Sequence, residues 1–206
     1  MLIVEHFFLI ACDPRAGLPT WPRRTQSAEL MAAAALLLDL ATLRRLSMRQ
    51  SLLHADAQVP LTHPLLADAL HALDGHPQSA QSALQLVARR LHPLPANVLE
   101  SLFRRDLVHR TESRRWLLRK QVRYPLRSMQ ARNEAVLRMR QAIDAENDLH
   151  GLALLLLADV TGMLPLHLNA REHEQAMQRL LALNLADTPS DEPRATVVAI
   201  RAALLA

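Results

Sequence analysis

The 206-residue sequence contains one cysteine, Cys12, and few glycines or aromatic residues. A single cysteine excludes an intramolecular disulfide and the zinc modules that need several cysteines, and it is compatible with a reducing compartment. Aromatic residues make up only 3% of the chain, so a hydrophobic core must be built from Leu, Ala and Val. Four glycines, and 12 prolines spread along the chain, exclude collagen-like and low-complexity classes.

The sequence also lacks a long hydrophobic run. A membrane-spanning helix needs about 18 consecutive apolar residues, but the runs at 31–38 and 152–158 stop at Asp39 and Asp159. Residues 9–12 (Leu-Ile-Ala-Cys) have the form of a lipoprotein cleavage box, yet no basic segment precedes them and the apolar run is short. We therefore expect Cys12 to be a small buried residue and the protein to be soluble, or at most peripheral to a membrane.

Catalytic and metal-binding signatures are missing as well. The sequence has no glycine-rich phosphate loop, no His-Glu-x-x-His and no Gly-x-Ser-x-Gly. Its ten histidines include no pair at the i, i+3 or i, i+4 spacing that places two ligands on one helical face; His167 and His173, for example, are six residues apart. We expect no enzyme activity, no cofactor and no metal site.

Hydrophobic periodicity predicts a mainly α, single-domain helical bundle. Apolar residues surround the predicted helix axis at 32–40 and 151–163, so these segments should be central helices. Residues 2–11 are predicted to be a short strand or the first turns of a helix. Further helices are predicted at 27–46, 65–73, 79–91, 96–105, 128–146, 151–163, 170–185 and 194–206.

Two β-hairpins interrupt the predicted helices. A small one would pair 46–48 with 52–54. A second one would have strands at 107–110 and 116–118, a polar turn at 111–115, and an end at Tyr124-Pro125, since proline cannot extend a paired strand. We predict one domain over residues 1–186, followed by a linker and a C-terminal helix over 187–206 that packs on the same domain.

The second hairpin lies in a strongly basic part of the chain. Between Arg104 and Arg140 there are twelve basic and three acidic residues, a net charge of +9, which leaves −5 for the remainder of a chain whose net charge is +4. A basic segment on an otherwise acidic protein points to a polyanionic partner, although a solvated Arg-rich face has the same composition. The heavy use of Arg, Leu and Ala suggests a bacterial origin.

The basic hairpin suits the surface of an anionic bilayer. Guanidinium groups bind phosphate through forked hydrogen bonds, and a tryptophan has both an apolar ring and a polar N–H for the membrane interface. Alternatively, Trp116 and Leu118 face the core and only the arginines face water. The residues predicted to contact the membrane are Arg114, Arg115, Trp116, Leu117, Arg119 and Lys120.

Two other functions remain open for the same segment. The predicted helix at 96–105 followed by a basic hairpin resembles the recognition helix and wing of a winged-helix domain, which would bind nucleic acid. Before Arg104 this helix carries only Asn97, Glu100 and Ser101 as polar residues, which is a poor set for contacting phosphates. The third possibility is an adaptor that docks an acidic protein or a second copy of itself.

Four segments in order resemble the Golgi phosphoprotein 3 family and its bacterial relatives over residues 4–185. They are the apolar start leading to 13–17 (Asp-Pro-Arg-Ala-Gly), the helix 30–40 with Arg44 and Arg45 after it, the segment 60–70, and the hairpin from Asp106 to its closing Tyr124-Pro125-Leu126. The resemblance implies a largely helical fold with a protruding hairpin whose apolar tip inserts into membranes.

The resemblance also implies binding of phosphatidylinositol 4-phosphate by a tryptophan and several arginines near the hairpin base. It places the family's tryptophan near Arg24, one arginine on Ala33, and two more near His92 and Pro95. The basic and aromatic residues of this chain in or next to those segments are therefore candidates for headgroup contact, namely Trp21, Arg23, Arg24, Arg89 and Arg90. We expect a non-catalytic cytoplasmic protein on the cytoplasmic face of a membrane, with anionic lipids as partners.

Overall fold

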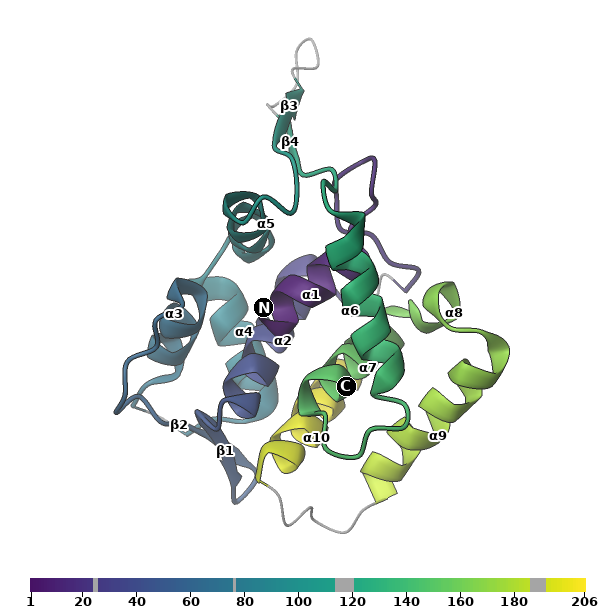
Figure 1. Ribbon diagram of the computed structural model, residues 1–206. Coiled ribbons are helices and arrows are strands. Elements are labelled where there is room, and N and C mark those ends of the chain that lie inside the picture. The colour runs from purple at the N-terminus through teal and green to yellow at the C-terminus, as the bar shows by residue number, and fades with distance from the viewer. Residues whose placement is uncertain (24–25, 76, 114–120, 186–191) are drawn as a thin grey trace.

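A computed structural model describes residues 1–23, 26–75, 77–113, 121–185 and 192–206. Helices dominate these residues, and two separate antiparallel strand pairs accompany them (Figure 1). The mainly α prediction is therefore confirmed. The elements are α1 (Ile3–Ala11), α2 (Ala28–Thr42), β1 (Leu46–Arg49), β2 (Leu52–Ala55), α3 (Pro64–Leu73), α4 (Ala80–Arg90), α5 (Leu94–Arg104), β3 (Thr111–Ser113), β4 (Gln121–Arg123), α6 (Met129–Gln141), α7 (Leu149–Thr161), α8 (Leu164–His167), α9 (Ala170–Leu185) and α10 (Glu192–Leu205).

The core is built around α2 and α7, the two helices whose sequences are apolar on every face. Every residue from Met31 to Ala41 and from Gly151 to Thr161 is buried. Each helix begins at a polar cap that accepts a backbone N–H: Ser27 in α2 and Asp148 in α7. Because no face of either helix can meet water, other helices must surround both: α1 and α10 pack against both helices, and α4 packs against α2.

The first segment is a helix, which resolves the two alternatives left by its sequence. Asp39 of α2 accepts hydrogen bonds from the backbone N–H groups of Ile3 (2.7 Å) and Val4 (3.1 Å), so a buried carboxylate satisfies the start of α1. Cys12 follows α1 and is buried, as expected.

The small hairpin is confirmed, and helix α2, which precedes it, ends earlier than predicted. β1 pairs with β2 in the register Leu46↔Ala55 to Arg49↔Leu52. Helix α2 stops at Thr42 because Arg44 adopts a left-handed conformation (φ 56°). The N–H of Arg45 then bonds the carbonyl of Leu40 (2.8 Å) and the N–H of Arg44 bonds that of Ala41 (2.9 Å), the two bonds of a Schellman cap.

The second hairpin projects from one end of the molecule (Figure 1), with a register different from the predicted one. β3 pairs with β4 from Thr111↔Arg123 to Ser113↔Gln121, so the predicted strand at 107–110 is wrong and residues 111–113, predicted to lie in the turn, form a strand. The predicted strand at 116–118 lies outside the described residues. Residues 107–110 instead lie beside 125–127 below the hairpin, where Val108 is buried in the core. The predicted end of the hairpin at Tyr124-Pro125 is confirmed, since β4 ends at Arg123.

Most other helices lie where the periodicity placed them. The bounds of α3, α4 and α9 agree with the prediction to within one residue, whereas α5 and α7 each begin two residues early. Helix α6 is shorter than the predicted 128–146 because turns replace it after Gln141 and Asp148 caps the next helix. Helix α10 packs against α2, α4 and α7, and its buried Arg201 pairs with Asp159 at 3.0 Å.

Candidate functional site

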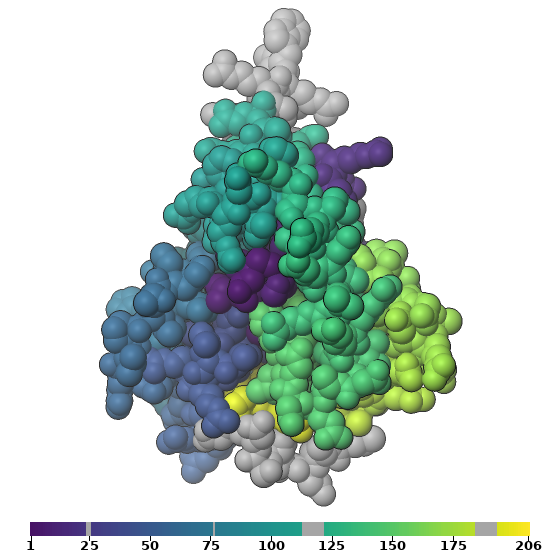
Figure 2. Space-filling view, viewed as in Figure 1, coloured from purple at the N-terminus to yellow at the C-terminus, as the bar shows by residue number. Residues whose placement is uncertain are grey.

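The projecting hairpin stands on a set of loops and helix ends that we call the hairpin root: residues 13–19, 103–110 and 124–129. The backbone N–H groups of Arg127 and Ser128 bond the carbonyl of Leu107 (3.0 and 3.1 Å), and the N–H of His109 bonds the carbonyl of Pro125 (2.8 Å). These bonds join the end of α5 to the start of α6. In Figure 2 the molecule narrows toward the teal and green segments that contain the root.

The loop after α1 braces the root from the side. The N–H of Tyr124 bonds the carbonyl of Gly17 (2.8 Å), and that of Leu126 bonds the carbonyl of Pro14 (3.0 Å). Gly17 is buried with φ +63°, and a Cβ there would lie 2.2 Å from the nitrogen of Pro125. Only glycine allows the loop backbone to lie this close to the backbone of Tyr124-Pro125, which explains why the turn at 13–17 ends in a glycine.

A hydrogen bond ties the hairpin to α5. The Tyr124 side chain is buried, and its hydroxyl donates to Glu100 at 3.1 Å. Burial, followed by the neighbouring Glu100 carboxylate, raises the pKa of Tyr124, so the phenol remains a donor. The root is therefore fixed on both sides, by α5 and by the loop after α1.

Arginines cover the outside of this root. Arg15, Arg104 and Arg127 are exposed on three different segments. Arg127 pairs with Asp106, whereas the side chains of Arg15 and Arg104 form no hydrogen bond or ion pair within the described part of the chain. Their guanidinium groups are thus available to an external anion.

Arg105 and Arg110 belong to the same basic run but have different roles. Arg105 donates to the fully buried Glu5 at 2.5 Å, and the same carboxylate accepts from Ser101 at 3.0 Å. Because removing one partner of a buried pair leaves the other charge uncompensated, Arg105 stabilises the fold. Arg110 lies 3.6 Å from Glu112 at the start of β3. The predicted membrane-contacting residues Arg114, Arg115, Trp116, Leu117, Arg119 and Lys120 lie outside the described residues.

The predicted headgroup residues of the first loop lie beside α1 and α7. Trp21 is half-buried and packs against Phe7 with ring centroids 5.9 Å apart. Arg23 donates to the carbonyl of Asp159 (3.2 Å) and lines a cavity of about 330 Å³ with residues of α7, α8 and α9. Arg24 lies outside the described residues.

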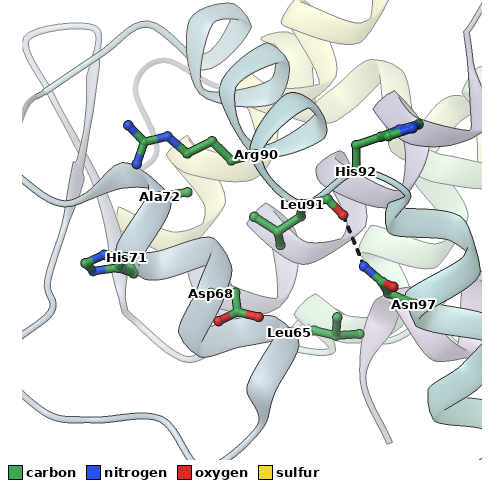
Figure 3. Close-up of a pocket in the computed structure, with 8 residues that line it drawn as sticks. All are labelled: Leu65, Asp68, His71, Ala72, Arg90, Leu91, His92 and Asn97. Carbon is green, nitrogen blue, oxygen red and sulfur yellow. Dashed lines mark hydrogen bonds between the residues drawn. The ribbon is translucent and has the colours of Figure 1, made fainter.

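The predicted residues of α4 lie at a different cavity. Arg89 is exposed and its Nε donates to the carbonyl of Gln85 at 3.3 Å. Arg90 lines an open cavity of about 330 Å³ between α3, α4 and α5, where its side chain extends across Ala72 toward His71 (Figure 3). The described structure therefore does not bring Arg23 and Arg90 into one pocket.

The place where the resemblance expects arginines contains a carboxylate instead. His92 Nδ1 lies 2.9 Å from Glu29 Oε1, and the other oxygen of Glu29 accepts the N–H of Leu94 at 3.0 Å. Ala33, one turn further along α2, is fully buried. A phosphate bound between the starts of α2 and α5 would face the negative charge of Glu29, which disfavours it.

Sequence reasoning missed a partly buried histidine pair because its members are 144 residues apart. His6 Nδ1 and His150 Nε2 lie 2.7 Å apart, with the rings edge to face. Burial, followed by nearby positive charge including Arg138, lowers the pKa of His6 to about 4 and that of His150 to about 3. Both rings are neutral at pH 7.

Other reactive groups offer little chemistry within the described ranges. Burial raises the pKa of Cys12 to about 12, so its thiol is protonated and a poor nucleophile. No group of three or more His, Cys, Asp or Glu side chains among the described residues is arranged to hold a metal ion. None of the helices described is long and apolar enough to cross a bilayer.

The architecture defines a mainly helical protein with a braced, arginine-covered root beneath a projecting hairpin. The family model for Golgi phosphoprotein 3 (GPP34) matches residues 3–205. The chain therefore belongs to the Golgi phosphoprotein 3 family, and the match runs from α1 to the last residue of α10, including both hairpins. A comparison with curated proteins gives no match.

Proposed function

We propose that this protein binds the anionic phospholipid headgroups of a membrane surface through the hairpin root and the basic hairpin segment 114–120, without catalysis. The observation that carries the proposal is the exposed Arg15, Arg104 and Arg127 around the root, at the end from which the hairpin projects (Figure 1). Family membership supports the same function, because the resemblance implies a lipid-binding hairpin. The segment 114–120 adds four basic residues and no acidic one.

Charge rather than headgroup shape should determine which lipids bind. The family resemblance makes phosphatidylinositol 4-phosphate a candidate ligand. In this chain, however, His92 lies near a position where the resemblance expects an arginine, and it contacts the carboxylate of Glu29. Arg23 and Arg90 line separate cavities. We expect this lipid to bind as one anionic lipid among others.

Removing two charges from the root tests the proposal. Each basic residue near an anionic surface contributes about 1 kcal/mol, so Arg15→Gln with Arg104→Gln should lower vesicle partitioning roughly 10- to 30-fold. The matched control is Arg49→Gln with Arg171→Gln, two exposed arginines of β1 and α9. Co-sedimentation with phosphatidylserine-containing vesicles measures both. Equal losses in the two variants would assign binding to total charge and contradict a specific surface.

Nucleic acid binding is the competing outcome of the same experiment. A duplex would also bind exposed arginines, with an affinity that falls steeply with salt because counterions are released. The exposed residues of α5 are Ala96, Asn97, Phe103 and Arg104, so the helix offers few polar side chains to contact bases. Tight duplex binding by a protein that ignores vesicles would replace the lipid proposal.

A further inference from the structure

Two large apolar side chains are exposed at the hairpin root, one on each side. Phe103 in the last turn of α5 is 37% exposed, and Met129, the first residue of α6, is 47% exposed. Single exposed apolar residues are common on protein surfaces. Two of them at one end, among arginines and beside a projecting hairpin, form an arrangement that suits an interface.

Hydrogen bonds of the backbone and of neighbouring residues place both Phe103 and Met129 near the hairpin. Phe103 lies three residues after Glu100, so the two share a helix face, and Glu100 accepts the hydroxyl of Tyr124 at 3.1 Å. The carbonyl of Phe103 accepts the N–H of Asp106 (2.9 Å), and Asp106 pairs with Arg127. Arg127 and Ser128, which directly precede Met129, both bond the carbonyl of Leu107.

Charge accompanies each apolar side chain. Arg104 follows Phe103 directly, and Arg127 lies two residues before Met129; both arginines are exposed. Apolar groups that enter the boundary between headgroups and acyl chains, with arginines at headgroup level, are the arrangement by which helices lie in an anionic membrane interface. The surface therefore fits a bilayer, which offers both acyl chains and anionic headgroups, better than a purely apolar or purely acidic partner.

We propose that Phe103 and Met129 are interfacial anchors, which enter an anionic bilayer on either side of the hairpin while Arg104 contacts headgroup phosphates and Arg127, paired with Asp106, lies at headgroup level. This inference rests on the proposed function and adds to it an orientation: the ends of α5 and α6 lie against the membrane. The hairpin then does not act alone, because the root also enters the interface.

Single-cysteine labelling tests the anchors directly. Cys12 is buried and its pKa is about 12, so an added cysteine can be labelled selectively, and unmodified protein serves as the labelling blank. Phe103→Cys and Met129→Cys would carry an environment-sensitive fluorophore. The matched control is Leu43→Cys, because Leu43 is 48% exposed beside Arg44. It lies between α2 and β1 in the chain, and Figure 1 shows β1 far from β3 and β4.

Phosphatidylcholine vesicles containing phosphatidylserine should increase the emission at positions 103 and 129 several-fold and shift it to shorter wavelength, with no change at position 43. Co-sedimentation of the same samples separates the two levels of the proposal. Labelled protein that sediments with vesicles while positions 103 and 129 remain unchanged would overturn the anchors but leave lipid binding intact. Absence of sedimentation would overturn lipid binding itself. An emission change that depends on protein concentration without vesicles would assign the surface to self-association and overturn the anchors.

Discussion

Gly17 is the residue on which the geometry of the hairpin root depends most directly. Its φ of +63° disfavours any side chain, and a Cβ would lie 2.2 Å from the backbone nitrogen of Pro125 and 2.3 Å from the carbonyl carbon of Tyr124. Backbone cannot move aside as a flexible side chain can. The loop after α1 and the base of the hairpin must therefore separate if this residue is replaced.

We predict that Gly17→Ala lowers the free energy of unfolding by more than 2 kcal/mol, roughly 1 kcal/mol from the backbone conformation and the remainder from the clash. Gly75→Ala is the matched control, since Gly75 also has a positive φ (+88°) but a Cβ added there would meet no atom within 4 Å. Urea unfolding measures both variants. Equal decreases in the free energy of unfolding for the two variants would show that the close approach of Gly17 to Tyr124-Pro125 does not affect stability.

The pair His6 and His150 should make stability depend on pH. Their hydrogen bond of 2.7 Å needs one ring to donate and the other to accept, so two imidazolium rings cannot maintain it. The pKa of each ring in the folded protein, about 4 and about 3, lies below the ordinary value of 6.5. As the pH falls, these two histidines therefore bind protons at a higher pH in the unfolded chain than in the folded protein. The contribution of the pair is complete above pH 6.5 and is lost as the pH falls toward 4.

Urea unfolding between neutral and acidic pH should therefore show a steeper loss of stability for the native chain than for His150→Gln. Each additional proton bound by the unfolded state adds up to about 1.4 kcal/mol per pH unit. Burial raises the pKa of Asp39 to about 7, which acts in the opposite direction but is common to both proteins. Parallel pH profiles would contradict a role for the histidine pair.

At the scale of elements, we expect substitutions in the projecting hairpin to weaken membrane binding without lowering the stability of the fold. Trp116 and Leu117 lie outside the described residues, and their sequence predicts membrane contact. Trp116→Ser with Leu117→Ser should lower vesicle partitioning at least tenfold, because burial of each large apolar side chain contributes about 1.5–3 kcal/mol. The Tm should remain that of the native chain. A large drop in Tm would instead show that the two side chains belong to the core.

Helices could be predicted well from sequence because their signals are local. The apolar runs of α2 and α7, and caps such as Ser27 and Ser79, lie within a few residues of the structure that they specify. The register of the large hairpin could not, because alternating apolar residues suit both a paired strand and a segment packed on the core. Val108 is 1% exposed, and its burial places residues 107–110 below the ladder rather than in it.

The candidate site was predictable in charge but not in geometry. The excess of arginine between Arg104 and Arg140 identified the basic end of the molecule. Contacts between distant residues decide which side chains are available: Arg105 is held by Glu5, and His92 by Glu29, 63 residues away in sequence. The exposure of Phe103 likewise depends on how α5 meets the hairpin. No local pattern shows these pairings.

At the scale of the whole molecule, the structure places its two hairpins far apart (Figure 1). The small hairpin packs against α10 and has Arg45 bonded to Asp56 and to the carbonyl of Val59. The large one stands on a braced root whose Arg15 and Arg104 have no partner among the described residues. A flat bilayer can meet only one of these ends at a time. Arg49 of the small hairpin is exposed too, but it lines a cavity with Asp56 and Asp74. The large hairpin adds four basic residues and no acidic one over 114–120, so we expect the bilayer to meet the root.

Vesicle co-sedimentation of the intact chain at about 0.15 M salt tests the central claim most directly. Three vesicle types are compared: neutral phosphatidylcholine, and phosphatidylcholine with either phosphatidylserine or phosphatidylinositol 4-phosphate at matched surface charge. We expect binding to both anionic vesicles to a similar extent and none to neutral ones. Binding to phosphatidylinositol 4-phosphate alone would contradict charge-driven recognition, and sedimentation with none of the vesicles would contradict membrane binding.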